Sequence, residues 1–129
     1  MTGLDTGYFV KLLQGHEVAL SVWREIVAGE REAVSVGLCL FELERLGLRG
    51  VISHHEQLIE SIPNVVSMAW ICDVKLTSRA ARLSHGNVIP AMDSLILAGL
   101  EGHQVTTIYT TDVDFVRYPN SDVSVVILD

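Results

Sequence analysis

Five acidic residues of this 129-residue chain lie beside short apolar runs, where a fold could bring them together. They are Asp5, Glu42, Asp93, Asp112 and Asp114. Carboxylate oxygens are hard ligands that suit Mg²⁺ or Mn²⁺. One or two such ions can activate a water and stabilise the oxyanions of a phosphodiester displacement. The chemistry that these residue types predict is therefore metal-dependent hydrolysis, provided that the fold gathers them.

Each acidic residue taken alone also has a purely structural explanation. Asp5 can cap a helix and Asp93 can lie in the first turn of one, where negative charge is favoured. Asp112 and Asp114 can be turn residues, and Glu42 can be solvated. Two carboxylates about 4 Å apart, however, repel by roughly 4 kcal/mol at an effective dielectric constant of 20. A fold that gathers several of them must supply protons or a cation.

Short β-branched or apolar segments alternate with segments of helical periodicity along the chain. The predicted strands cover residues 2–4, 33–36, 65–66, 104–109 and 123–128. The predicted helices cover residues 8–13, 16–28, 38–48, 54–61, 69–84 and 91–101. Apolar strands separated by helices are typical of a sheet covered on both faces. We therefore predict a single domain over residues 1–129 of the α/β class, a three-layer α/β/α sandwich with a mainly parallel sheet.

The acidic residues have related places in this arrangement. Asp5 directly follows the first predicted strand, and Asp112 lies in the segment just after the fourth. Glu42 lies two turns into the helix after the second strand, and Asp93 one turn into the helix before the fourth. Ligands of open α/β sheets bind outside the carboxyl ends of the strands. We therefore expect these four carboxylates to converge at that edge.

Four segments, in order, resemble the motifs of the PIN-domain nucleases, and in particular of the small VapC-type toxins. They are residues 5–8 (Asp-Thr-Gly-Tyr), 35–43 with Glu42-Leu43, 89–98 (Ile-Pro-Ala-Met-Asp-Ser-Leu-Ile-Leu-Ala) and 110–115 (Thr-Thr-Asp-Val-Asp-Phe). The resemblance extends over essentially the whole chain. It implies a PIN-like α/β/α fold.

The resemblance also implies roles for individual residues. Asp5, Glu42, Asp93 and Asp112 would be the catalytic carboxylates that hold Mg²⁺ or Mn²⁺, with Asp114 either a fifth ligand or a residue that orients the loop. Three hydroxyl residues would support the carboxylates or their waters by hydrogen bonds. These are Thr6, Ser94 and Thr111.

Basic side chains that could contact substrate phosphates are few. The candidates are Lys11, Arg45, Lys75 and Arg79. Lys75 and Arg79 lie one helical turn apart, so they could form a rail for RNA phosphates or simply a solvated helix face. With nine Lys and Arg against sixteen Asp and Glu, the net charge of −7 argues against a broad basic face for duplex DNA.

The function expected from these residues and this resemblance is a divalent-metal-dependent endoribonuclease. The resemblance further implies the toxin of a toxin–antitoxin pair, with an RNA substrate, a cognate antitoxin and a second copy of the chain as partners. A non-catalytic PIN-like module that binds RNA or protein is the alternative. The sequence contains no glycine-rich nucleotide-binding motif.

The remaining composition bears on location and interfaces. Cys39 and Cys72 lie in apolar segments and lack the spacing of metal ligands, so we expect buried, reduced thiols. We expect no signal peptide and no membrane span. The predicted location is therefore the cytoplasm. The apolar residues of segment 8–13 exceed what a short rim helix would bury, which predicts an exposed interface patch there. Trp23 and Trp70 are expected in the core or in an interface.

Overall fold

The computed structural model describes residues 1–129 and contains one sheet of five strands. The strands are β1 (Thr2–Leu4), β2 (Ala33–Val36), β3 (Ser67–Ala69), β4 (Thr107–Thr110) and β5 (Ser124–Ile127). Their order across the sheet is β3-β2-β1-β4-β5, and every neighbouring pair is parallel. The predicted α/β class is confirmed, and the sheet is wholly rather than mainly parallel.

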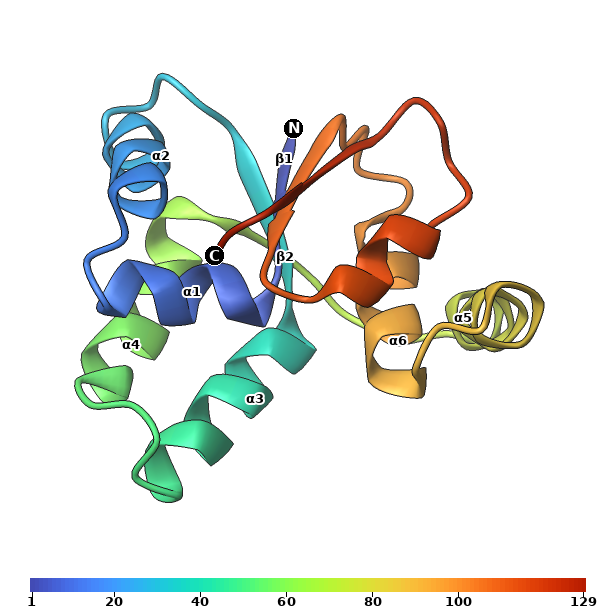
Figure 1. The fold of residues 1–129 in the computed structure, drawn as a ribbon, viewed down its shortest axis with the longest axis horizontal. Helices are drawn as coiled ribbons and strands as arrows, with labels where there is room; N and C mark the ends of the chain where they lie inside the picture. Colours follow the sequence, from blue (N-terminus) through green and yellow to red (C-terminus); the bar gives the residue numbers. More distant parts are fainter.

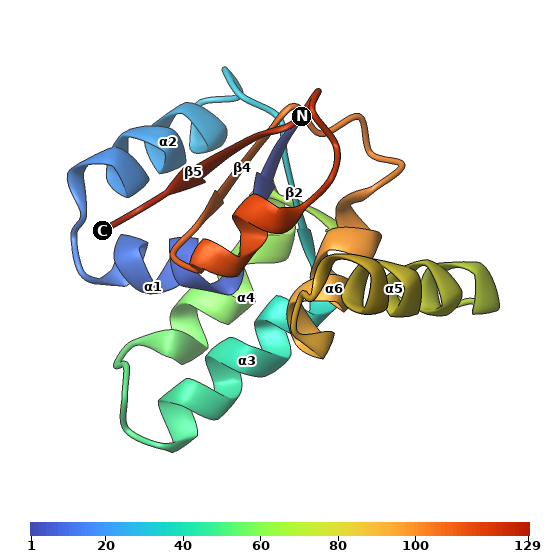
Figure 2. The ribbon, with the colours of Figure 1, turned by 45° about the vertical axis from the view of Figure 1, so that its right-hand side comes forward.

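Helices cover both faces of the sheet (Figures 1 and 2). They are α1 (Thr6–Leu13), α2 (Glu17–Val27), α3 (Gly37–Leu48), α4 (His55–Val65), α5 (Val74–Asn87), α6 (Ala91–Leu100) and the short 3-10 helix η1 (Val113–Arg117). Figure 1 shows α1, α2 and α4 on one side of the sheet and α5, α6 and η1 on the other. The strands' carboxyl ends therefore open between α1, α3 and α6.

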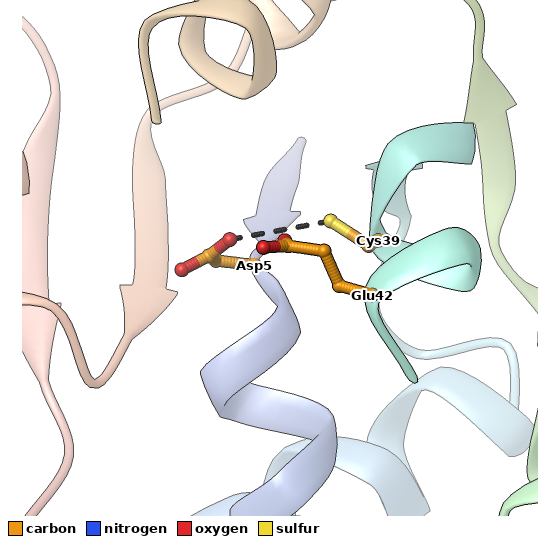
Figure 3. Close-up of side chains that lie close together, drawn as sticks. All are labelled: Asp5, Cys39 and Glu42. Atoms are coloured by element: carbon orange, nitrogen blue, oxygen red, sulfur yellow. Dashed lines mark hydrogen bonds between the residues drawn. The ribbon is translucent and has the colours of Figure 1, made fainter. Parts of the chain in front are cut away.

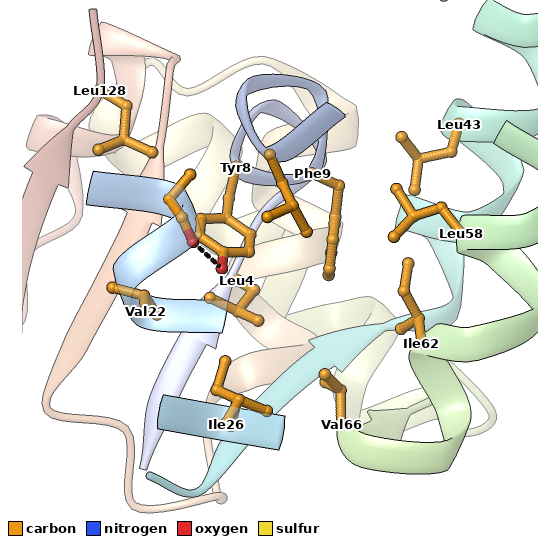
Figure 4. Close-up of a cluster of buried hydrophobic side chains, with 13 residues drawn as sticks. Leu4, Tyr8, Phe9, Val22, Ile26, Leu43, Leu58, Ile62, Val66 and Leu128 are labelled. Carbon is orange, nitrogen blue, oxygen red and sulfur yellow. Dashed lines mark hydrogen bonds between the residues drawn. The ribbon is translucent and has the colours of Figure 1, made fainter. Parts of the chain in front are cut away.

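The core beneath α1, α2 and α4 contains the aromatic residues of α1 (Figure 4). Tyr8 and Phe9 are fully buried, and Leu12 is 9% exposed. The Tyr8 hydroxyl donates a hydrogen bond of 2.8 Å to the carbonyl of Ala19 in α2. The predicted interface patch at residues 8–13 is therefore wrong, because α2 and α4 cover these side chains within the same chain.

A second core lies between the sheet and helices α5 and α6. Phe115 of η1 is fully buried in it, together with Leu97 of α6 and Val36 of β2. Asp93 lies one turn before the buried Leu97 in α6, so the packing of this helix against the sheet sets the position of Asp93.

The structure moves the boundary between α4 and β3. The predicted strand at Val65–Val66 is wrong: Val65 ends α4, and the strand runs over Ser67–Ala69. The helix continues past Pro63, where we expected it to stop, and the Val66 amide still donates to the Ile62 carbonyl at 2.9 Å. Burial of Ile62 in the core outweighs the backbone hydrogen bond that proline lacks.

Two further elements differ from their predicted bounds by three residues or more. The helix expected over residues 69–84 is α5, Val74–Asn87. It begins later than predicted because Ala69 pairs with Val36 in the sheet. The Asp73 side chain then caps the helix by accepting a hydrogen bond of 2.8 Å from the Leu76 amide. The strand expected over residues 104–109 begins only at Thr107, since Gln104 has a φ of +54°.

One prediction of burial also fails: Cys39 is fully buried, but Cys72 is exposed. Trp70 is 59% exposed, so of the two expected places for it, the core is excluded and an interface stays a prediction. Trp23 is half-buried against Phe9, with ring centroids 6.4 Å apart. None of the helices combines the length and apolar character needed to cross a bilayer.

Candidate metal centre

Four carboxylates from distant parts of the chain meet at the carboxyl edge of the sheet. Asp5 follows β1, Asp112 follows β4, Glu42 comes from α3 and Asp93 from the first turn of α6. All four line one cleft of about 240 Å³. The other lining residues are Thr6, Gly7, Val10, Leu46 and Thr111. The convergence predicted from the sequence is therefore present in the structure.

Asp5 is the most deeply buried of these acids. Its Oδ2 accepts a hydrogen bond of 2.6 Å from the Thr110 hydroxyl, and its Oδ1 lies 4.0 Å from the Cys39 sulfur (Figure 3). Burial, together with the charges of Glu42 and Asp112, raises the pKa of Asp5 to about 6, although the hydrogen bonds from the Thr110 hydroxyl and the Thr6 amide lower it. The fold therefore holds a carboxyl here whose ionised form needs a nearby cation.

Glu42 projects from α3 toward Asp5, as Figure 3 shows. The Thr6 hydroxyl donates a hydrogen bond of 2.6 Å to Glu42 Oε1. Thr6 is the first residue of α1, directly after Asp5. This bond links the first turn of α1 to α3, and it fixes one oxygen of Glu42 while the other is free to bind a ligand.

Asp93, Asp112 and Asp114 form the other half of the acidic centre. One oxygen of each lies within 4.8 Å of the others. Desolvation, the hydrogen bond with Asp112 and the charges of Asp112, Asp5 and Asp114, in decreasing order of effect, together raise the pKa of Asp93 to about 8. Without a cation, Asp93 therefore retains its proton at neutral pH.

The backbone after β4 is organised by the side chains of the same loop. The Asp112 amide donates to the Thr110 hydroxyl oxygen at 3.0 Å, and the Asp114 amide donates to Asp112 Oδ1 at 2.9 Å. Since Thr110 also donates to Asp5, a continuous hydrogen-bonded chain joins the two halves of the acidic centre.

Thr111 and Ser94, which were expected with Thr6 to support the carboxylates by hydrogen bonds, differ in their surroundings. Thr111 lines the cleft. Ser94 is buried, and its hydroxyl donates to the Ile89 carbonyl at 3.3 Å. The structure thus gives Ser94 a backbone partner in the turn that leads into α6, where a bond to one of the carboxylates or their waters was expected.

Gly7 permits close contact between α1 and the loop after β4. A Cβ added at Gly7 would lie 2.8 Å from the backbone nitrogen of Thr111, closer than real Cβ contacts. We expect Gly7→Ala to push α1 and the loop apart, lowering the melting temperature and weakening Mn²⁺ binding at least about tenfold. Calorimetry and metal titration would check this. Gly86→Ala, whose Cβ meets nothing within 4 Å and which lies in α5, is the control: it should leave Mn²⁺ binding unchanged and should not lower the melting temperature.

None of the four basic candidates lines the cleft. Arg79 forms a bidentate pair with Glu101 at 2.8 and 3.1 Å, and Lys75 is exposed on the same helix, α5, which lies outside α6 (Figure 1). Arg45 is exposed on α3, and Lys11 is half-buried in the last turn of α1. The structure therefore leaves Arg45 and Lys11, on helices that border the cleft, as the nearer candidates.

Sequence reasoning missed two residues that contact Asp5. Thr110 was placed after the fourth strand, but it ends β4 with a buried side chain that points to Asp5. Cys39 was treated only as a core residue. The signal for Thr110 was its place at the end of a strand beside β1, because adjacent parallel strands put their last residues side by side.

Replacing Thr110 tests how the Asp5 carboxylate is held. Thr110→Val keeps the shape of the side chain but removes the donor to Asp5, so Mn²⁺ affinity should fall about 10–100-fold. Thr107→Val, in the same strand but away from the cleft, should leave affinity unchanged. Equal affinities for the two variants in a calorimetric titration would show that the hydroxyl plays no part in binding.

No protein-family model and no curated protein sequence matches the chain. Solved structures do match it. A chain of a toxin–antitoxin complex from Klebsiella pneumoniae has 17% sequence identity and a TM-score of 0.71, with 96% of this chain and 99% of that chain covered.

Two further structures agree. A chain of VapBC2 from Rickettsia felis, bound to a DNA fragment from the promoter, has 20% identity and a TM-score of 0.67, with coverage of 99% and 98%. A chain of FitAB bound to an IR36 DNA fragment has 21% identity and a TM-score of 0.63, with coverage of 98% and 94%. The chain has a PIN-like fold. The expectation drawn from the four motifs is confirmed at the level of the fold.

The PIN-like fold explains why the motifs are so far apart in the sequence. Asp5 and Asp112 are brought together because β1 and β4 are neighbours in the sheet, although more than a hundred residues separate them. Glu42 and Asp93 reach the same place from helices on either side. The similarity covers nearly the whole length of this chain and of each neighbour, so it is a similarity of the complete fold.

Proposed function

We propose that this chain is a single-domain, divalent-metal-dependent endoribonuclease of the VapC type, the toxin of a toxin–antitoxin pair acting in the cytoplasm. The observation that carries the proposal is the cleft into which Asp5, Glu42, Asp93 and Asp112 project. A fold gains nothing from gathering carboxylates that repel one another unless a cation or protons offset the repulsion.

The donor set fits a hard divalent ion. The cleft offers carboxylate and hydroxyl oxygens, and its lining contains no histidine. Such oxygen ligands suit Mg²⁺ and Mn²⁺. Asp5, Glu42, Asp93 and Asp112 would hold the ion. When bound, it would supply Lewis acidity toward the phosphodiester and a lowered pKa for an attacking water.

The chain's own residues orient this site. Thr110 donates to one oxygen of Asp5, and Thr6 donates to one oxygen of Glu42. Each bond orients its carboxylate, so the remaining oxygen points in a defined direction. Cys39 closes the base of the site beside Asp5 and keeps water from the buried side of that carboxylate. Arg45, one turn after Glu42, is well placed to contact an RNA phosphate beside the cleft.

Partners of two kinds follow from the proposal. The structural neighbours come from toxin–antitoxin complexes, which supports a cognate antitoxin for this chain. Large apolar side chains are exposed on several elements, as expected of a protein that forms interfaces with an antitoxin and with a second copy of itself. The most exposed are Val74, Leu48, Val88, Val113, Val116 and Trp70.

Cleavage of a labelled RNA pool tests the proposal. The purified chain should cut RNA in Mn²⁺ or Mg²⁺, and EDTA should stop the reaction. Asp112→Asn should lose the activity and keep the fold, as judged by circular dichroism. If several RNAs bind to the chain in gel shifts but none is cut in either metal, the protein is a PIN-like binding module and the proposed activity is wrong.

A further inference from the structure

One arginine contacts the acidic centre. Arg117 Nη1 forms a salt bridge with Asp114 Oδ1 at 2.9 Å and donates a hydrogen bond to the Val88 carbonyl at 2.8 Å. Arg117 ends η1, and Val88 follows α5 directly before the turn into α6. The guanidinium therefore ties the segment that carries Asp114 to the turn that leads to Asp93.

Asp114 differs from the other four acids in its charge balance. It is the only one of them that the structure pairs with a basic side chain. Its Oδ1 forms the salt bridge with Arg117, and its backbone amide donates a hydrogen bond to Asp112 Oδ1. The Asp114 side chain is 28% exposed and that of Arg117 49%, so water screens this pair from the Arg117 side but only partly at Asp114. An unpaired Asp114 would instead add a full negative charge beside Asp93 and Asp112.

We infer that Arg117 is a positioning residue that takes the place of a second cation, so that the cleft binds one divalent ion and Asp114 is not a ligand. This inference rests on the proposed metal-dependent function. The guanidinium neutralises Asp114 where it stands, within 4.8 Å of its two acidic neighbours. Without Arg117, Asp93, Asp112 and Asp114 would present three free carboxylates, which is a ligand set that a second ion can use.

Counting bound Mn²⁺ tests this role directly. Calorimetric titration and electron paramagnetic resonance should find one ion in the wild type and in Arg117→Lys, because an ammonium can still hold Asp114. Arg117→Ala should bind a second ion at millimolar Mn²⁺. The double variant Arg117→Ala/Asp114→Asn should return to one. Arg24→Ala removes the same charge from an exposed site on α2 and should not change the count.

A measurement without metal gives an independent result. At pH 7.5 in EDTA, Arg117→Ala should melt several degrees below the wild type, since it leaves Asp114 unpaired in the acidic centre. Adding Asp114→Asn should restore most of that loss. A purely structural role through Val88 would instead give the same loss in both backgrounds.

Three outcomes have distinct meanings. Two ions in the wild type, one of them lost in Asp114→Asn, would show that Asp114 is a ligand and overturn the inference. An unchanged ion count in Arg117→Ala, with no coupling to Asp114 in melting, would overturn it as well. If no variant binds Mn²⁺, the proposed metal-dependent function is wrong, and the melting cycle alone then decides whether Arg117 acts through Asp114.

Discussion

Asp93→Asn should abolish metal-dependent RNA cleavage, lowering the rate more than about a hundredfold, and should at the same time stabilise the metal-free protein above neutral pH. Asp93 is half-buried among three other carboxylates, and burial with their charges raises its pKa to about 8. The amide keeps the shape and a hydrogen-bonding oxygen but carries no charge. It therefore removes both the ligand and the repulsion.

The paired readout distinguishes a site residue from a structural one. Rates are measured on a labelled RNA in Mn²⁺, and melting is followed in EDTA at pH 8.5. A residue needed only for folding would lose activity and stability together. Asp122→Asn, the same substitution at an exposed position outside the cleft, should change neither. Full cleavage by Asp93→Asn in a preparation free of other ribonucleases would disprove the assigned site.

The second large effect is a fall in the stability of the metal-free protein as pH rises from about 4 to 8, and its reversal by Mn²⁺. In the folded chain the pKa of Asp5 is about 6 and that of Asp93 about 8, against an ordinary value of 3.8. At a pH between the ordinary pKa and the raised pKa of each group, the folded state binds more protons than the unfolded state. The free energy of unfolding must then decrease as pH rises through this range.

Mn²⁺ replaces those protons with a stronger source of positive charge. At a hundredfold excess over its Kd, an ion that binds only the folded state adds about 2.7 kcal/mol. For a chain of this size, that should raise the melting temperature by about 10 °C at pH 7.5. The gain should shrink toward pH 5, where protons compete with the ion for Asp93 and Asp5.

The experiment uses the difference between two pH profiles, because other groups also titrate. Melting temperatures of wild type and Asp93→Asn are recorded in EDTA from pH 4 to 8.5. The variant should lack much of the decline above pH 6, where Asp93 is the group still losing its proton. Parallel profiles for the two proteins would refute the coupling of Asp93 to stability. An unchanged melting temperature in millimolar Mn²⁺ would speak against an assembled metal site.

Much of this architecture could be predicted from the sequence because its signals are local. Strands β1 and β2 have their predicted bounds, since a short apolar run followed by a helical pattern identifies a buried parallel strand. The acids could be placed at one edge because Asp5 directly follows β1 and Asp112 lies two residues after β4. The motif around Asp93 identified the helix that carries it, α6, to within one residue at its end.

The errors lie where local preference competes with packing. Pro63 predicts a helix end, but α4 continues because Ile62 and Leu58 are buried on one face. The apolar residues of α1 predicted an exposed interface, yet they are covered by α2 and α4. Amphipathic pattern indicates that a face will be buried, but it does not specify which part of the chain will cover it.

The sequence by itself determined the residue types of the site, the order of its motifs and the layered class of the fold, because each depends on short-range patterns of polarity and charge. Only the tertiary structure decided the partners of the acids. Thr110 holds Asp5, Thr6 holds Glu42, and Arg117 neutralises Asp114. The Thr110 and Thr6 contacts depend on strand order and helix packing, which bring together atoms 105 and 36 residues apart. Arg117 is only three residues from Asp114, but its role depends on the turn at Val88 that α5 and α6 place beside it.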